Sequence, residues 1–226
     1  MKFDILTLFP EMFTGPFDQS IIKRAQEKSI VEINIHDIRK FAIDERGTVD
    51  DTPYGGGVGM VMRIEPIYEA LKNIKNPKTN TKIVLLDARG NKFTQQRAKD
   101  FSQLDQLILI CGHYEGVDER VKEYLVDESI SIGDYVLTGG ELPAMVIADA
   151  VTRLIPGVLS KPEATSLESF STVNGESSPT VNPYLEHPQY TRPEEFNGWK
   201  VPEVLLSGNH KEIENWRKAH SVGEMP

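Results

Sequence analysis

Apolar residues recur along the first two thirds of the chain in two patterns. Short runs in which nearly every residue is apolar predict buried β-strands, and the clearest is residues 107–111. Longer stretches with apolar residues three or four positions apart predict amphipathic helices. Strands are expected at 2–9, 31–36, 83–86 and 107–111, and helices at 17–28, 66–75, 94–102, 141–154 and 209–219.

The alternation of strands and helices predicts an α/β fold with a largely parallel sheet. In the helix at 141–154, the residues expected to face the core are Leu142, Met145, Ala148 and Val151. Residues 156–190 break the pattern because they are rich in Pro, Ser, Thr, Asn and Glu, which predicts a linker or a segment that orders on binding. The expected organisation is an α/β domain over 1–158, a flexible linker over 159–186 and a small, mainly helical domain over 187–226.

The composition of the 226 residues is that of an ordinary globular protein. No apolar run reaches the ~20 residues that span a bilayer, and the first residues lack a signal-peptide pattern, so we expect a cytoplasmic protein without a membrane partner. Cys111 is the only cysteine and the five histidines are scattered, so we expect no disulfide and no dedicated metal site. The net charge of −9 argues only weakly against nucleic acid, because binding depends on where basic residues lie.

Three glycine-bearing loops follow apolar runs, at 85–90, 111–116 and 131–143. In open α/β sheets ligands bind outside the carboxyl ends of the strands, so converging loops would surround an adenosine-sized ligand with main-chain groups. A tight structural turn is the alternative for each loop. The common nucleotide fingerprints are absent, which disfavours a phosphate cradle. A fourth cluster, at 53–60, has no clear flanking strand and fits either a surface loop or part of a site.

Several motifs occur in an order that is specific to one enzyme family. They are Phe9-Pro10-Glu11-Met12-Phe13 and the segments 50–60, 111–120, 131–143, 190–193 and 206–210. Together they resemble the bacterial tRNA (guanine-N1)-methyltransferases of the TrmD family, which modify the guanosine 3′ of the anticodon, at tRNA position 37. The similarity spans nearly the whole chain. Because this family belongs to the SPOUT superfamily, the resemblance implies a deep trefoil knot, which periodicity cannot predict.

The resemblance also implies S-adenosyl-L-methionine as the methyl donor. Matching the motifs residue by residue gives the expected cofactor contacts Leu85, Leu86, Gly112, Tyr114, Glu115, Gly116, Ile132, Gly133, Asp134, Tyr135, Val136, Leu137, Gly139, Gly140 and Pro143. For Ile132 and Leu137, core packing is a compatible alternative. The expected partners are the tRNA anticodon stem-loop and a second copy of the chain, in a homodimer that shares its active site. The resemblance also implies that the small domain over 187–226 binds tRNA. A need for Mg²⁺ in turnover is left open.

The family places its catalytic base in an Asp-Ser-Phe motif after the long helix. This chain has Glu168-Ser169-Phe170 there, so Glu168 is the expected base that removes the N1 proton of guanine. Arg153 corresponds to an arginine that faces guanine O6 or a phosphate. The alternatives are an exposed linker glutamate and an arginine that stabilises a helix C-terminus.

Four features depart from the family pattern: Glu168 itself, an insertion at 171–185, the charged turn at 87–89 and a short C-terminus. Candidate phosphate contacts are Lys161, Arg192, Lys200, Lys211, Arg217 and Lys218, although a solvated face is the default for each. Two alternative functions stay open, namely a knotted methyltransferase acting on another RNA site and an inactive RNA-binding homologue.

Overall fold

The computed structural model describes residues 1–161, 165, 168–170 and 184–223. The chain divides into two compact units, Met1–Ser160 and Lys161–Pro226, and each is described by itself.

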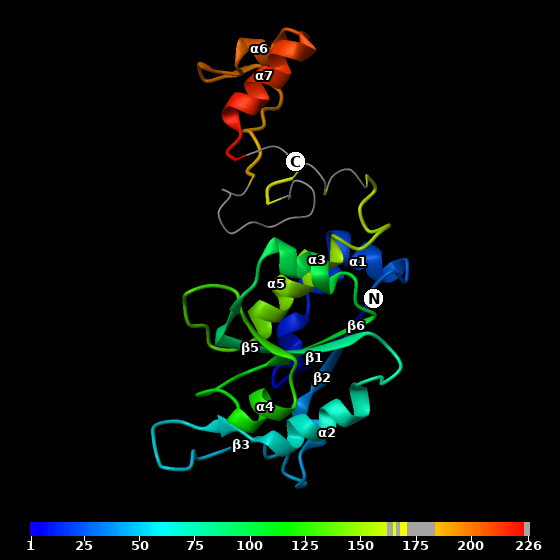
Figure 1. Cartoon of the computed structure of the whole chain (residues 1–226), viewed down its shortest axis with the longest axis vertical. Coiled ribbons are helices and arrows are strands. Elements are labelled where there is room, and N and C mark those ends of the chain that lie inside the picture. The colour runs from blue at the N-terminus through cyan, green and yellow to red at the C-terminus, as the bar shows by residue number, and fades with distance from the viewer. Residues whose placement is uncertain (162–164, 166–167, 171–183, 224–226) are drawn as a thin grey trace. The chain divides into compact units, whose positions relative to one another are not determined.

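A five-stranded sheet forms the centre of the first unit (Figure 1). Its strands are β1 (Lys2–Thr7), β2 (Glu32–Asp37), β5 (Thr81–Lys92), β6 (Gln106–Cys111) and β7 (Glu128–Ser131). They lie in the order β2-β1-β6-β5-β7, and every neighbouring pair is parallel. The predicted α/β class with a largely parallel sheet is therefore confirmed.

Helices cover both faces of this sheet (Figure 1). One face carries α1 (Ser20–Glu27), α3 (Gln95–Phe101) and α5 (Glu141–Thr152), and the other carries α2 (Ile64–Ile74) and α4 (Glu119–Tyr124). All six residues of β6 are buried, because apolar side chains that point to both faces of a central strand need a helix layer on each side. Short 3-10 helices occur at Pro10–Phe13, Pro16–Asp18 and Ile38–Phe41.

β5 continues well past the predicted end at residue 86. Its pairing with β7 is interrupted between Leu86 and Asn91 and then resumes, so residues 87–90 loop out of the ladder. Gly90 closes this loop against β7, where an added Cβ would lie 2.5 Å from the Ile130 nitrogen. The charged turn at 87–89 is thus an interruption within a strand, at the edge where ligands bind in such sheets.

The predicted inner face of α5 is partly wrong. Ala148 and Val151 are buried as expected, but Leu142 is 50% exposed. Ala144 and Ile147 are buried instead. α5 is apolar around most of its circumference, so periodicity alone does not identify the side that packs. The patterns also predict neither α4 nor β7, nor the two-residue strands β3 (Asp50–Asp51) and β4 (Val61–Met62) that flank the glycine cluster at 53–60.

The second unit contains the hairpin β8 (Glu195–Phe196) and β9 (Trp199–Lys200), the short helix α6 (Glu203–Leu206) and α7 (His210–His220). The predicted C-terminal helix is confirmed, and Asn209 caps it by accepting a hydrogen bond from the Glu212 backbone N–H. Within the predicted linker, the Phe170 N–H donates to the Tyr184 carbonyl at 2.7 Å.

Candidate cofactor site

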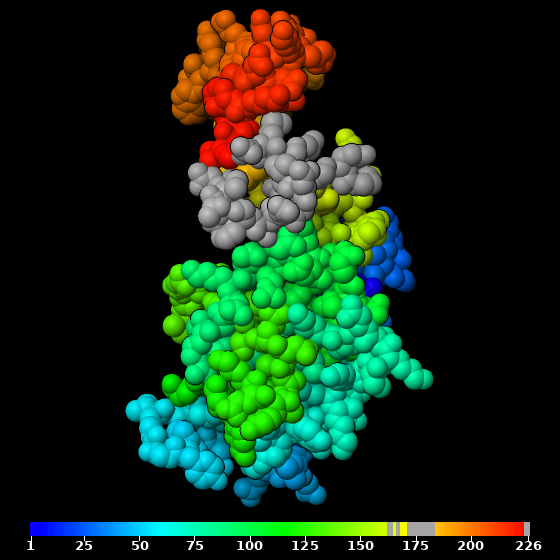
Figure 2. Space-filling model, viewed as in Figure 1, coloured from blue at the N-terminus to red at the C-terminus, as the bar shows by residue number. Residues whose placement is uncertain are grey.

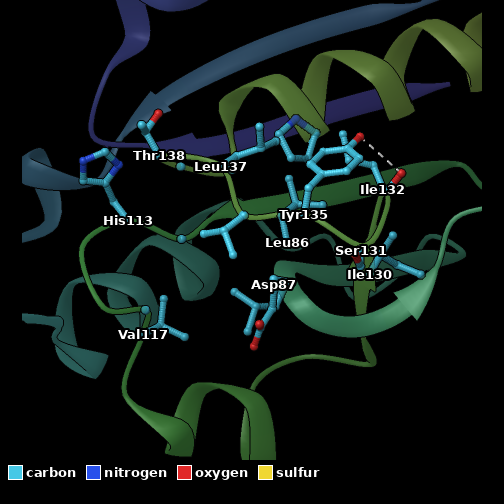
Figure 3. Close-up of a pocket in the computed structure, with 18 of the residues that line it drawn as sticks. Leu86, Asp87, His113, Val117, Ile130, Ser131, Ile132, Tyr135, Leu137 and Thr138 are labelled. Atoms are coloured by element: carbon cyan, nitrogen blue, oxygen red, sulfur yellow. Dashed lines mark hydrogen bonds between the residues drawn. The ribbon is translucent and has the colours of Figure 1, made fainter.

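A pocket lies in the first unit at the carboxyl ends of β5, β6 and β7 (Figure 3). The hollow measures about 750 Å³ when the adjoining open solvent is included. The pocket is lined by Leu85, Leu86, Asp87, Ala88, Gly112, His113, Tyr114, Glu115, Gly116, Val117, Ile130, Ser131, Ile132, Gly133, Tyr135, Val136, Leu137, Thr138, Gly139, Gly140 and Pro143. The three glycine-bearing loops therefore converge on one pocket.

Two of these loops are in direct backbone contact. The Gly140 N–H donates to the Gly112 carbonyl at 2.9 Å, and His113 and Gly139 form an isolated antiparallel bridge. An added Cβ on Gly140 would lie 2.6 Å from Cys111 Cα and 3.0 Å from the Gly112 nitrogen. Glycine is needed here because the backbone entering α5 runs closer to the end of β6 than any side chain would allow.

The C-terminal end of the glycine cluster at 53–60 contacts the wall of the same pocket. The Glu115 N–H donates to the Met60 carbonyl at 3.0 Å, and the Met62 N–H donates to the Gly116 carbonyl at 2.9 Å. An added Cβ on Gly59 would lie 2.7 Å from the Glu115 side chain. The rest of the cluster projects from the first unit, visible as light-blue surface in Figure 2, and Tyr54 is fully exposed.

Apolar side chains and two carboxylates line the pocket. Tyr135 folds back along its own loop, with its hydroxyl donating to the Ile132 carbonyl at 3.4 Å (Figure 3). No lysine or arginine is among the described lining residues, whereas Asp87 and Glu115 both are. Burial raises the pKa of Asp87, but hydrogen bonds from the Arg89 backbone and guanidinium lower it overall, so Asp87 is ionised at neutral pH. The pocket is therefore suited to an uncharged or cationic ligand with an aromatic or apolar body.

A buried carboxylate, Glu141, lies where the loop at 131–143 enters α5. Glu141 is 1% exposed, and its Oε1 accepts a hydrogen bond from the Thr7 hydroxyl at 2.7 Å. The same hydroxyl oxygen accepts the Phe9 N–H at 2.9 Å. Burial, and secondarily the charge of Glu141, raises the pKa of the Cys111 thiol, so this cysteine is protonated and acts as a packing residue.

The family model described as tRNA (guanine-1)-methyltransferase TrmD matches residues 1–225. The chain belongs to this family. A tRNA (guanine-N(1)-)-methyltransferase of Carboxydothermus hydrogenoformans is 56% identical over 222 residues, which cover 98% of this chain and 83% of that protein. Proteins with the same name from Geobacter sp. (strain M21) and Pelotomaculum thermopropionicum are 53% and 54% identical, each covering 98% of this chain and 85% of the relative.

The structure brings together all but one of the cofactor contacts that the TrmD resemblance implies. The exception is Asp134, which does not line the pocket; its carboxylate is 81% exposed and pairs with Lys92. Asp87, Ala88, His113, Ser131 and Thr138 line the pocket without having been predicted, although all five lie in the three loops. Val117 and Ile130 also line the pocket but lie outside the loops. Ile130 belongs to β7, so only a prediction of that strand could have identified it.

The two predicted catalytic residues lie in different units. Arg153 caps the C-terminus of α5 in the first unit, where its N–H donates to the Asp149 carbonyl. Glu168 is half-buried in the second unit. The adjacent Ser169 N–H donates to Glu186 Oε2 at 3.3 Å, and the Glu186 N–H donates to Ser169 Oγ at 3.0 Å. These two bonds fix the backbone next to Glu168 against residue 186.

Two general features of the described residues bear on ligands and location. No group of three or more His, Cys, Asp or Glu side chains in them could hold a metal ion. No helix among them is long and apolar enough to cross a membrane.

Proposed function

We propose that the protein transfers a methyl group from S-adenosylmethionine to N1 of the guanosine at tRNA position 37, next to the anticodon. Membership of the TrmD family establishes the enzyme class. The observation that carries the cofactor assignment is the glycine-built pocket, whose described lining includes carboxylates and no lysine or arginine. The insertion at 171–185 lies outside the described residues and enters no step of the proposal.

The pocket residues fit this cofactor. A nucleotide with phosphates would need cationic partners, and no lysine or arginine is among the described lining residues. The adenosine part of S-adenosylmethionine carries no phosphate and needs no such partner. Leu86, Ile132 and Leu137 offer apolar surface for a purine ring, and main-chain groups of the glycine loops lie on the same wall, where they can bond its edge. The carboxylate of Glu115 suits a ligand that carries sulfonium and ammonium charges.

When bound, S-adenosylmethionine supplies the chemistry of an electrophilic methyl group attached to a sulfonium. The chain must then activate the acceptor. N1 of guanine carries a proton at neutral pH, and we assign its removal to the Glu168 carboxylate, a contribution of about 10²–10⁴-fold in rate for a positioned base. Loss of this proton places negative charge on guanine O6, which the Arg153 guanidinium would stabilise.

The target base has to leave its stack to reach a methyl group held in a pocket. This requirement favours a nucleotide in an unpaired loop, where RNA sequence is generally read. It agrees with the guanosine beside the anticodon as the acceptor and with the anticodon stem-loop as the partner.

We further propose a homodimer that shares its active site, with α5 at the interface. Leu142 and Val146 lie one turn apart on α5 and are 50% and 46% exposed. Phe9 and Met12, around the 3-10 helix that packs on α5, are 36% and 43% exposed. One apolar side of α5 packs on the sheet, and the other, with Leu142 and Val146, is exposed in the single chain. A symmetric contact with a second copy would bury this exposed side. Dimerisation also offers a route by which Glu168 of one copy serves the pocket of the other.

A trefoil knot in the first unit also remains part of the proposal. The packing of the 139–140 segment against 111–113 supports it, because such close passage of two loops is what a threaded chain would require. Action in the cytoplasm stays a prediction from the sequence, and a magnesium requirement stays open.

The decisive variant is Glu168→Gln, which keeps the shape of the side chain and removes its basicity. We expect nearly normal affinity for S-adenosylmethionine in calorimetric titration and a loss of turnover of about 10²–10⁴-fold. Glu168→Asp, the family residue, is the matched control and should retain most of the turnover. Transcripts with and without a guanosine after the anticodon test the site. Cofactor binding with no turnover in the wild type would favour an RNA-binding homologue instead.

A further inference from the structure

The second unit has a pocket of its own. Its residues come from the segment before the β8–β9 hairpin, from β9 and α6, and from one side of α7. The pocket is lined by His187, Pro188, Gln189, Tyr190, Thr191, Arg192, Glu194, Val201, Leu205, Leu206, Ile213, Trp216 and Arg217. Its lining therefore combines aliphatic side chains, aromatic rings and two guanidinium groups. The described lining of the cofactor pocket has no guanidinium group.

Trp216 is fixed as a platform on the wall of this pocket. The His220 imidazole stacks on the indole with ring centroids 4.1 Å apart and an angle of 21°, and His220 Nδ1 lies 2.7 Å from the Trp216 carbonyl oxygen. His187 and Tyr190 meet the indole edge-on at 6.1 and 6.2 Å. Because His220 does not line the pocket, it supports the indole from outside while other parts of the ring border the cavity.

The two arginines of the pocket have no carboxylate partner among the described residues. In the part of the chain that the structure describes, Arg192 and Arg217 enter no ion pair, whereas Lys200 pairs with Glu195 and Lys218 with Glu214. Glu194 is the one carboxylate among the described lining residues. Unpaired guanidinium groups are well suited to phosphate oxygens, which they can bind with two parallel hydrogen bonds.

His187 adds a polar group without a partner. Its Nδ1 is buried and accepts or donates no hydrogen bond among the described residues. Burial and the neighbouring Arg217 lower the pKa of His187, so its ring is neutral at physiological pH. A neutral imidazole can hydrogen-bond the edge of a nucleobase as donor or acceptor.

We propose that this pocket binds one unpaired nucleotide of the RNA substrate, with its base against Trp216 and its phosphate on Arg192 and Arg217. Aromatic rings and guanidinium groups side by side are the combination that proteins use to hold single-stranded nucleic acid. The inference rests on the proposed function for the presence of RNA. It adds a contact in the second unit that takes no part in methyl transfer.

Tryptophan fluorescence gives a direct test, because the chain has only Trp199 and Trp216. In Trp199→Phe, titration with an unmodified anticodon stem-loop RNA is expected to quench the remaining Trp216 signal as the complex forms. The matched control is Trp216→Phe, in which Trp199, 73% exposed and outside the pocket, should change little. Binding of the RNA without quenching of Trp216 would overturn the proposal.

The same protein tests for a competing occupant. If Trp216 of the free Trp199→Phe protein is already shielded from acrylamide, then another part of the chain or a second copy fills the pocket, and the nucleotide proposal is wrong. Ready quenching by acrylamide that is suppressed by the RNA supports it.

Two neighbouring positions on α7 provide a charge test that does not depend on the aromatic rings. Arg217→Ala removes a guanidinium that lines the pocket, whereas Lys218→Ala removes a cation that pairs with Glu214 and does not line it. We expect Arg217→Ala to weaken RNA binding, to lower the salt slope of log K by about 1, and to raise KM for tRNA without changing kcat. Lys218→Ala should change all three much less, because Lys218 is paired with Glu214 and does not line the pocket. Equal effects from both variants would contradict the proposal.

Methyl transfer measured on the same samples separates the two ideas. If the wild type methylates tRNA, but RNA does not quench Trp216 and Arg217→Ala does not weaken RNA binding, the nucleotide pocket is refuted and the proposed function stands. If the wild type binds S-adenosylmethionine but methylates no tRNA, the proposed function fails, and the quenching of Trp216 by RNA then decides the nucleotide pocket by itself.

Discussion

Gly140→Ala should disrupt the contact on which the cofactor pocket is built. The backbone at Gly140 has φ −84°, which alanine adopts freely, so any effect is steric. The new methyl group would lie 2.6 Å from Cys111 Cα, compared with the roughly 3.5 Å of an ordinary carbon–carbon contact. The loops at 111–116 and 131–143 would therefore have to separate by about 0.9 Å. Overpacking of this kind typically costs about 1–3 kcal/mol of stability.

Gly112→Ala is the matched control, since it adds a methyl group to the same pocket with less crowding. Its Cβ would meet the Leu86 carbonyl oxygen at 3.3 Å, a contact that a small shift relieves. Urea unfolding should show a clear loss of stability for Gly140→Ala and a smaller one for Gly112→Ala. Because misplacing aligned groups by about 1 Å can cost ~10²-fold in rate, the first variant should also lose most of its turnover. A Gly140→Ala protein with wild-type stability and turnover would refute the reasoning.

Three further predictions concern other parts of the first unit. Thr7→Val leaves the buried carboxylate of Glu141 without its hydrogen-bond donor and should lower the free energy of unfolding by about 1–3 kcal/mol. Thr7→Ser keeps the hydroxyl and should not lower it. Equal losses of stability in the two variants would argue against the hydrogen bond. Burial raises the pKa of Asp4, but hydrogen bonds from His36 and Gln106 lower it overall, so its stabilisation is present above the unfolded pKa of about 4 and is lost as pH falls through the folded value. Urea unfolding at pH 7 and pH 3 should therefore show a larger loss for the wild type than for Asp4→Asn, and parallel losses would contradict this. We expect the wild type to run as the proposed dimer and Leu142→Glu to run as a monomer in light scattering after gel filtration, and a Leu142→Glu dimer would exclude α5 from the interface.

Much of the fold follows from local sequence, and the parts that do not have physical reasons. β6 is predictable because apolar residues on both faces of a strand require cover on both sides. β7 is not, since three of its four residues (Glu128–Ser131) are polar and its place in the sheet depends on a neighbour more than 30 residues away. The inner face of α5 escapes prediction because apolar side chains surround the helix and only tertiary packing selects Ala144 over Leu142.

The site shows the same division. Glycine-bearing loops after apolar strands predict that the segments around Leu86, Gly112 and Gly140 meet, because parallel strands end at one edge of the sheet. Sequence could not show that Asp134 points away to Lys92, since neighbouring side chains in an irregular loop follow no period. Nor could spacing show that residues 60–62 pair with 115–118, because that pairing joins segments from different parts of the chain.

The most direct test of the account is a reaction of the purified protein with isotope-labelled S-adenosylmethionine and unmodified tRNA, followed by nuclease digestion and mass spectrometry. The account predicts a single labelled product, N1-methylguanosine, at the position that follows the anticodon. Label at another nucleotide, or no transfer by protein that retains the cofactor, would contradict it.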